Sequence, residues 1–302
     1  VPAEQGFEYA LKISPSTTAN ASGSHEVRFS HTIEAQMFPD LSYGTAAAKN
    51  MVLSFWFKTN KVGLYSVYFE HSGTGTAKRK YLTFTPAQSG TWERIELLVT
   101  GDTDTAFPIN VSTRGMTIAW YLDNTPNLDS ANAEEDWGTA VLVNSSNNIN
   151  FMDNTSNELY ITGVQLEVAN TATDFEYLPF DVVLNRCQRY FYNLSSLGPY
   201  VPASSGAYLG TGYYYTSSFV IAQIHLPTAM RTEPTLTTSN ASDSFIFYRD
   251  NAGDNMDDLS LNGSSSAICV TVGNNSDVSG TSGMAGGLLV SSGSICNISA
   301  EL

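Results

Sequence analysis

Aromatic side chains in polar surroundings are the residues of this sequence with the clearest potential for binding chemistry. Tyr208, Tyr213 and Tyr215 fall in a Gly-rich stretch, and Trp137 falls in a long polar segment. Sugar rings stack their C–H faces on Tyr and Trp rings, and sugar hydroxyls bind Asn, Asp and Gln. These four residues are therefore candidates for glycan binding. The alternative is that the tyrosines belong to a core or to a subunit interface.

Acidic side chains gather in two places. Asp250–Asp258 carries the oxygen donors that a hard cation prefers, without the spacing of an EF-hand loop. The segment is either an exposed acidic turn or the site of one structural calcium, and the sequence assigns no metal ligands. No other cofactor is expected. Glu134–Asp136 is expected to be a solvated loop.

The sequence contains none of the common catalytic motifs. Its four histidines are scattered, and no nucleophile elbow, zinc-protease motif or phosphate-binding loop occurs. We expect His25 and His31 to be ordinary polar residues and the protein not to be an enzyme. Paired glycosidase carboxylates are defined by their separation in space. A glycan depolymerase therefore stays as an alternative.

Three cysteines, Cys187, Cys269 and Cys296, are too few for a disulfide framework. Cys269 and Cys296 could pair, but sequence alone does not establish this. Buried free thiols are the preferred interpretation.

Composition indicates a β-rich chain of 302 residues. Charged residues make up only 14% and aromatic residues 12%, a profile of strands joined by polar turns. The net charge is −15, and no lysine follows Lys80. Such a chain repels phosphate backbones and anionic membranes, so neither nucleic-acid binding nor adhesion to an anionic membrane is expected. No apolar run approaches the ~20 residues that would span a bilayer, so membrane insertion is not expected either.

Alternating apolar residues predict strands in the first part of the chain. Phe7–Ile13 reads as a first strand, and Met51–Lys58 is almost continuously apolar, which favours a central position. Arg114–Leu122 alternates and places Trp120 in a core. Further alternating runs continue to Val168. This spacing of strands and turns predicts an antiparallel β-sandwich.

The second part of the chain, Asn193–Leu302, predicts a small β-sandwich of short strands. In Ser218–Leu226 one parity is wholly apolar from Val220 onward, so that side is expected to be buried. The other parity carries Phe219, Ile221 and Gln223. Apolar residues are sparse here, which would be easier to explain if subunits shared a core.

Glu158–Tyr192 joins the two parts. Leu159–Val168 reads as a strand with one apolar face, and Val182–Phe191 reads as a helix that Asp181 caps. Its apolar residues at helical spacing are Val183, Leu184, Cys187, Tyr190 and Phe191. The helix is too short to be stable alone, so it must pack between domains or around a threefold axis. Arg186 and Arg189 fall on its other side and are expected to pair with carboxylates. The residues of this joint are Arg186, Cys187, Arg189 and Tyr190.

Three runs within this joint resemble a junction of phage tail-fibre and virion-associated proteins: Ile161–Glu167, Ala172–Glu176 and Leu184–Phe191. The pairing of Ser54–Lys58 with Trp92–Glu96 resembles the central strands of carbohydrate-binding jelly rolls. The resemblance implies a carbohydrate-binding-module-like jelly roll over residues 1–180. A linking helix over 181–192 and a C-terminal β tip domain over 193–302 would follow.

The resemblance also implies a function. It suggests a structural fibre protein, on the tail or the head of a bacteriophage virion, that attaches to a host. Expected partners are two further copies in a homotrimer, other virion proteins, and a host cell-surface glycan or protein. A secreted carbohydrate-binding module is the alternative reading.

Overall fold

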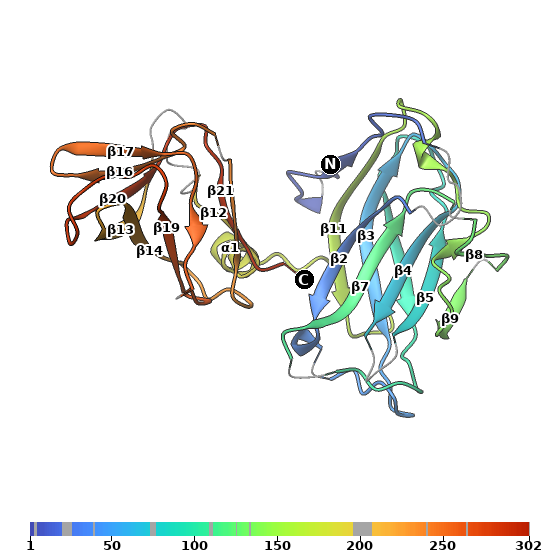
Figure 1. Cartoon of the computed structure of the whole chain (residues 1–302). Coiled ribbons are helices and arrows are strands. Elements are labelled where there is room, and N and C mark those ends of the chain that lie inside the picture. The colour runs from blue at the N-terminus through green and yellow to red at the C-terminus, as the bar shows by residue number, and fades with distance from the viewer. Residues whose placement is uncertain are drawn as a thin grey trace. The chain divides into compact units, whose positions relative to one another are not determined.

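The protein is described here by a computed structural model (Figure 1). It describes residues 1–2, 5–19, 26–38, 40–72, 77–108, 111–124, 126–132, 134–195, 207–239, 241–263 and 265–301. The chain divides into two compact units with a boundary between Glu176 and Tyr177. The helix expected to link the domains therefore groups with the second unit. We describe each unit by itself.

Unit 1 is a jelly-roll β-sandwich. A four-stranded sheet in the order β1-β11-β3-β6 faces a five-stranded sheet in the order β2-β7-β4-β5-β9. Apart from the added edge strand β9, this order is that of a double Greek key, which confirms the predicted fold. Its longer strands are β1 (Leu11–Ile13), β2 (Arg28–Glu34), β3 (Met51–Thr59), β4 (Tyr65–His71), β5 (Lys78–Phe84), β6 (Glu93–Val99), β7 (Arg114–Tyr121) and β11 (Leu159–Glu167). Its shorter elements are β8 (Asp129–Ser130), β9 (Glu135–Gly138), β10 (Asn144–Ser145) and the 3-10 turns η2 (Ala35–Met37) and η3 (Phe151–Asp153).

The core of unit 1 lies between these two sheets. Strand β3 is buried along most of its length and lies between β11 and β6, as its apolar sequence predicts. Trp120 is 5% exposed and stacks on Phe29 with 5.0 Å between ring centroids. Phe55 meets the same indole edge to face. The predicted core position of Trp120 is confirmed.

Strand β1 is shorter than the sequence predicts. Only Leu11–Ile13 pairs with β11, and Tyr9 and Leu11 are exposed rather than directed into the core. Phe7 leaves the strand direction and packs edge-on against Phe175, with 5.1 Å between ring centroids. The prediction of a continuous strand over Phe7–Ile13 is therefore wrong.

A β-bulge interrupts β11. The pairing with β3 shifts register between Thr162 and Gln165, and Gly163 within the shift has a φ of 58°. Leu159 and Ile161 face the core before the bulge, and Leu166 packs on it afterwards. An extra residue reverses the alternation, so the single apolar face predicted for this strand is wrong.

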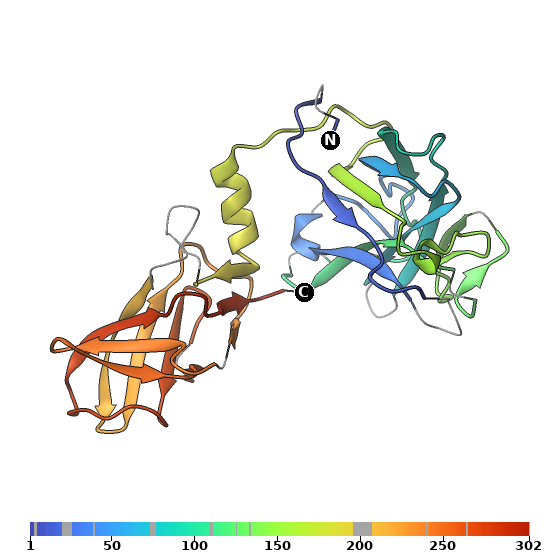
Figure 2. The ribbon, with the colours of Figure 1, turned by 90° about the horizontal axis from the view of Figure 1, so that it is seen from above.

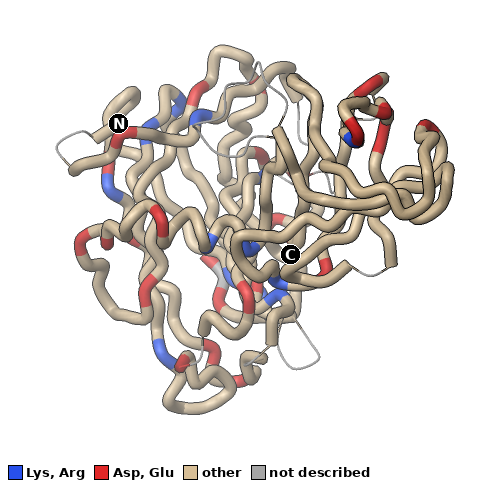
Figure 3. Tube along the Cα trace, turned by 90° about the vertical axis from the view of Figure 1, so that its left-hand side faces the viewer, with Lys and Arg blue, Asp and Glu red and all other residues tan. Residues whose placement is uncertain are grey.

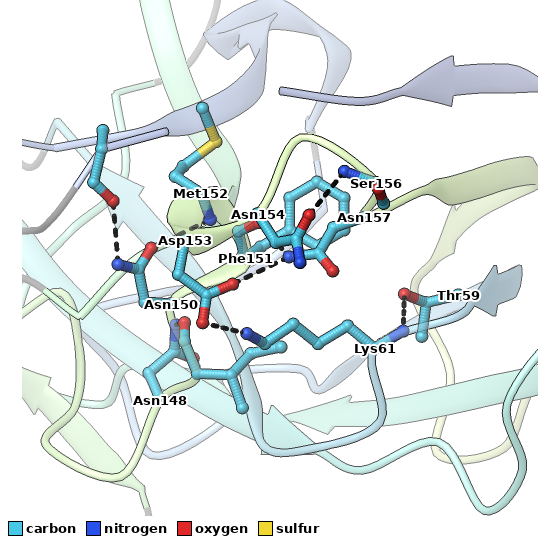
Figure 4. Close-up of polar contacts among 12 residues, drawn as sticks. Thr59, Lys61, Asn148, Asn150, Phe151, Met152, Asp153, Asn154, Ser156 and Asn157 are labelled. Atoms are coloured by element: carbon cyan, nitrogen blue, oxygen red, sulfur yellow. Dashed lines mark hydrogen bonds and ion pairs between the residues drawn. The ribbon is translucent and has the colours of Figure 1, made fainter. Parts of the chain in front are cut away.

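Asparagine side chains hold the segment that leads into β11 (Figure 4). Asn150 caps η3 by accepting a hydrogen bond of 2.9 Å from the amide of Met152. Asn157 donates to the Phe151 carbonyl at 2.8 Å and to Asp153 Oδ1 at 2.9 Å, and Lys61 pairs with the same carboxylate. These bonds fix where β11 begins.

The segment expected to be a solvated acidic loop is partly a strand. Strand β9 pairs with β5, and Asp136 accepts a hydrogen bond of 2.8 Å from the nearly buried Lys80 ammonium. This hydrogen bond lowers the pKa of the Asp136 carboxyl. Val143, which follows β9 in the chain, packs over Tyr68 and Tyr121 on the outer side of the five-stranded sheet.

Unit 2 is a smaller β-sandwich with one helix (Figure 2). A seven-stranded sheet has the order β17-β16-β20-β13-β14-β19-β18, and a three-stranded sheet has the order β12-β21-β15. Val220, Ala222 and Ile224 are each 1% exposed, which confirms the buried parity predicted for β14. The elements are α1 (Phe180–Gln188), β12 (Phe191–Asn193), β13 (Ala207–Thr216), β14 (Phe219–His225), β15 (Thr235–Thr238), β16 (Phe245–Arg249), β17 (Ala252–Met256), β18 (Ser260–Leu261), β19 (Cys269–Asn274), β20 (Ala285–Val290) and β21 (Cys296–Ser299).

Helix α1 begins before its predicted start and ends before its predicted end. Pro179 occupies the position before the first turn, and no side chain caps it, so the capping role predicted for Asp181 is wrong. Pro179 has a φ of −54° and a ψ of 142°, so it is the extended residue before the helix, and its ring leaves no N–H there that would need a partner. The chain turns into β12 at Phe191. No residue of α1 is buried within the chain.

Acidic residues are spread along the chain, with fewer basic residues among them (Figure 3). In the described part of the chain, no helix has both the length and the hydrophobicity to cross a bilayer.

Candidate functional site

Strand β13 presents its tyrosines alternately to the two faces of the seven-stranded sheet. Tyr213 and Tyr215 are 45% and 58% exposed, whereas Tyr214 between them is fully buried. Successive side chains of a strand point to opposite faces, which accounts for this division. The buried Tyr214 hydroxyl donates to Asp254, so Asp254 and Tyr214 fix the strand from the inner side.

Tyr213 and Tyr215 line an open groove of about 790 Å³. The groove crosses the exposed face of the sheet where β13, β14, β19 and β20 lie side by side. Its lining residues are Thr211, Gly212, Tyr213, Tyr215, Phe219, Ile221, Gln223, Asn262, Thr271, Ala285 and Gly286.

Small residues make the floor of this groove. Gly212, Ala285 and Gly286 line it, and Ala285 is the direct partner of Tyr213 on β20. Beside the groove, a Cβ atom on Gly273 of β19 would lie 2.7 Å from Cε2 of Phe219, so a larger residue there would displace this ring. Tyr215 meets Phe219 edge to face at 6.0 Å. The aromatic rings therefore stand around a floor that has few side chains of its own.

A row of polar side chains runs beside the aromatic ones. Thr211, Gln223 and Thr271 are direct partners across β13, β14 and β19. Asn262 directly follows β18, and its backbone N–H donates a hydrogen bond of 2.8 Å to the Thr271 carbonyl. No residue that lines the groove carries a charge. Hydroxyl and amide groups beside aromatic faces suit an uncharged polyhydroxyl ligand.

The other two aromatic candidates do not join this groove. Tyr208 is 61% exposed, but it precedes the register shift in β13 and rests on Gly287. Trp137 belongs to unit 1 and packs on its core. Its indole Nε1 donates to the Thr100 carbonyl at 2.6 Å, and its ring lies 4.9 Å from that of His71. Trp137 is therefore half-buried against the core of unit 1 and does not line the groove.

The joint residues lie at the end of α1. Arg186 and Cys187 are exposed, and no ion pair is found for Arg186 within the described residues. The carbonyl of Arg189 accepts from the amide of Arg231 at 2.9 Å, and that of Tyr190 accepts from Ala300 at 2.7 Å. These backbone bonds tie the end of the helix to the rest of unit 2.

The cysteines differ in burial and are all free thiols. Cys187 is exposed and Cys269 is half-buried, so for these two the expectation of buried thiols is wrong. Cys296 is fully buried, and burial raises the pKa of its thiol to about 12.

The acidic segment Asp250–Asp258 begins with an exposed turn, as one of the two sequence interpretations has it, and continues into the second strand of a hairpin. Asp250 and Asn251 have φ values of 42° and 59° and make the two-residue turn between β16 and β17. The Asp254 carboxylate accepts hydrogen bonds from Arg249 at 3.2 Å and from the amide of Ser279 at 3.1 Å. Nowhere in the described ranges do three or more His, Cys, Asp or Glu side chains form a metal-binding group.

His25 lies outside these ranges, and His31 is exposed on β2.

Phe219, Gln223, Asn262 and Thr271 were not among the residues that the sequence predicted for binding. The first two could have been found, because they share the parity of β14 that does not enter the core. Asn262 and Thr271 come from strands whose place beside β14 has no signal in the local sequence.

No protein-family model matches the chain, and no curated protein matches it in sequence. The function must therefore be argued from the groove.

Proposed function

We propose that the protein is a non-enzymatic attachment protein that binds an uncharged host-surface glycan in the groove of unit 2. The observation that carries this proposal is the arrangement of Tyr213, Tyr215 and Phe219 beside the polar row of β13, β14 and β19. Rings supply stacking surfaces for sugar C–H groups, and the amide and hydroxyl groups exchange hydrogen bonds with sugar hydroxyls.

The uncharged lining argues for a neutral glycan. The net charge of −15 repels anionic ligands at long range, and no basic side chain in the groove compensates. The groove is also wide enough for a small oligosaccharide, because ligand sites of about 300–1,000 Å³ are typical for small molecules.

We further propose that the protein is a fibre on the tail or head of a bacteriophage virion. The support is the resemblance of the Ile161–Tyr192 segment to the joints of such fibres. In this setting the chain would assemble as a homotrimer, contact other virion proteins, and reside on the particle surface. A secreted carbohydrate-binding module with the same groove is the second candidate.

Glycan-array binding by the full chain, followed by titration of the best ligand, tests the binding proposal. We expect Tyr213→Ala and Tyr215→Ala each to weaken binding roughly tenfold or more, because each removes a stacking surface. Tyr248→Ala is the matched control: Tyr248 is 43% exposed on β16 of the same sheet but does not line the groove.

Two outcomes contradict the binding proposal. One is wild-type glycan affinity in both groove variants. The other is a change of sedimentation coefficient in these variants, with no glycan bound by the parent chain, which would make the groove a subunit interface. Immunogold electron microscopy of particles separates a virion fibre from a secreted module.

A further inference from the structure

Three asparagine side chains hold together the two ends of the long loop in unit 1 that carries β8, β9 and β10. Asn144 and Asn148 donate from Nδ2 to the Asp123 carbonyl at 3.0 and 2.8 Å. Asn124 donates in the opposite direction, from Nδ2 to the Ser146 carbonyl at 2.7 Å. The start and the end of the loop therefore meet at these five residues, which we call the loop neck.

The side-chain oxygens of the same three asparagines have no such bonds. Oδ1 of Asn124, Asn144 and Asn148 is buried and has no hydrogen-bond partner in the described part of the chain. Reversing an amide would not help, because its oxygen would then face a backbone carbonyl. A buried acceptor without a partner costs free energy, and an ordered water or an ion is its usual explanation in native proteins.

The composition of the loop neck favours a cation over water. A water molecule has two hydrogens and can donate to only two of the three oxygens, whereas a cation attracts all of them. Asp123 is 2% exposed and adds a negative charge that a cation balances. Amide, carboxylate and backbone oxygens are the ligands of calcium.

The burial of these oxygens is consistent with an enclosed calcium ion. Calcium lies about 2.3–2.6 Å from its oxygen ligands, closer than the roughly 2.8 Å at which a water hydrogen-bonds. Oxygens that surround a calcium site can therefore be inaccessible to water. Asn144 is fully buried and Asn148 is 5% exposed, so both are held where such a site needs them.

We propose that unit 1 binds one calcium ion at the loop neck, through Oδ1 of Asn124, Asn144 and Asn148. The ion would fasten the two ends of the loop and so stabilise the folded unit. Most of the proposed ligands are amides rather than carboxylates, in contrast to the acidic segment Asp250–Asp258 of unit 2. The site is independent of the groove in unit 2.

Thermal unfolding of the full chain, stripped of metal with EDTA and then titrated with calcium chloride, tests this proposal. All four tryptophans belong to unit 1, so their fluorescence follows this unit. We expect the midpoint to rise by about 5–10 °C at a calcium concentration about 100 times Kd, because a ligand of the folded state stabilises it by mass action. An unchanged midpoint at millimolar calcium would overturn the proposal in favour of ordered water.

A matched pair of variants tests the location. Asn148 and Asn157 are both buried and each donates to a backbone carbonyl at 2.8 Å, but of the two only Asn148 has a buried oxygen without a partner. We expect both Asn148→Leu and Asn157→Leu to be less stable than the parent chain, and only Asn148→Leu to lose the calcium-dependent rise. Asn124→Leu, at a half-buried position, should lose it as well and replaces Asn148→Leu if that variant does not fold. The proposal is overturned if Asn148→Leu keeps the full rise, or if Asn157→Leu loses it too.

Discussion

At the scale of single residues, His71 and Asp102 form a buried pair beneath Trp137. His71 Nε2 lies 2.9 Å from Asp102 Oδ2, and both side chains are almost wholly buried. Burial disfavours the charged imidazolium and lowers the pKa of His71 below its ordinary value of 6.5, and the Asp102 hydrogen bond offsets this only in part. The unfolded chain therefore takes up this proton at a higher pH than the folded chain does.

This difference predicts how the stability of unit 1 depends on pH. Above pH 6.5 the imidazole is neutral in both states and contributes nothing. As the pH falls below 6.5, the imidazole becomes protonated in the unfolded state while it stays neutral in the folded state, so the free energy of unfolding decreases. Urea unfolding between pH 7.5 and 5.5 measures the slope. His71→Gln should reduce this slope, and His31→Gln, at an exposed position, should not; equal slopes in the two variants would count against the prediction.

The groove shows how far single residues can be predicted from sequence. Alternation alone puts Tyr213 and Tyr215 on one face of a strand, because that property is local to a strand, but it does not say that this face is exposed. It assigns Tyr208 to the opposite face, whereas the register shift between Tyr208 and Gly210, which depends on the pairing with β20, leaves Tyr208 exposed. The half-buried position of Trp137 could not be predicted either, because its polar sequence surroundings do not reveal the acceptor at Thr100.

At the scale of elements, the bulge in β11 depends on glycine. Gly163 has a positive φ, and a Cβ atom there would lie 2.4 Å from Cζ of Phe7. Gly90 in the same unit has a φ of 73° with open space around it, so it isolates the backbone effect. We expect Gly90→Ala to cost about 1–2 kcal/mol of unfolding free energy from backbone strain.

Gly163→Ala should lower the free energy of unfolding by roughly 1–3 kcal/mol more than Gly90→Ala does, because the Phe7 ring must also move. Denaturant unfolding of unit 1, followed by tryptophan fluorescence, compares the two variants. Equal losses would show that the Phe7 contact does not constrain the bulge.

The element ends were the least predictable part of the fold. The jelly roll and the buried face of β14 follow from periodicity, which the sequence carries directly. The end of α1 does not, because Tyr190 and Phe191 continue the helical spacing while the backbone pairs Phe191 with Ser299 of β21. The pairing with a strand far along the sequence therefore ends the helix before the local apolar pattern does.

At the scale of the whole molecule, each unit has a hydrophobic core of its own. Phe55 is fully buried in the core of unit 1 and Phe245 in that of unit 2. We expect calorimetry to resolve two unfolding transitions. Phe55→Ala should destabilise only one of them and Phe245→Ala only the other, each by about 3–5 kcal/mol. A single transition that both variants shift equally would contradict this division.

The exposed side of α1 gives the proposed homotrimer a testable contact. Phe180, Val183 and Leu184 are 74%, 41% and 41% exposed, on a helix with no buried residue. Such a short helix is stabilised by packing. We expect Leu184→Glu to convert a trimer to monomers in sedimentation velocity, and Asn185→Glu, at the adjacent exposed position, to leave it assembled. A monomeric parent chain at micromolar concentration would rule this contact out.

The absence of lysine after Lys80 also determines how the protein can be handled. Every lysine side chain of this sequence belongs to unit 1, so reagents that acylate amines, including dyes and activated sensor surfaces, leave the side chains of unit 2 unmodified. Coupling through lysine should therefore tether the molecule by its jelly roll and keep the Tyr213 groove chemically intact. Coupling through a thiol would instead reach the exposed Cys187 in unit 2.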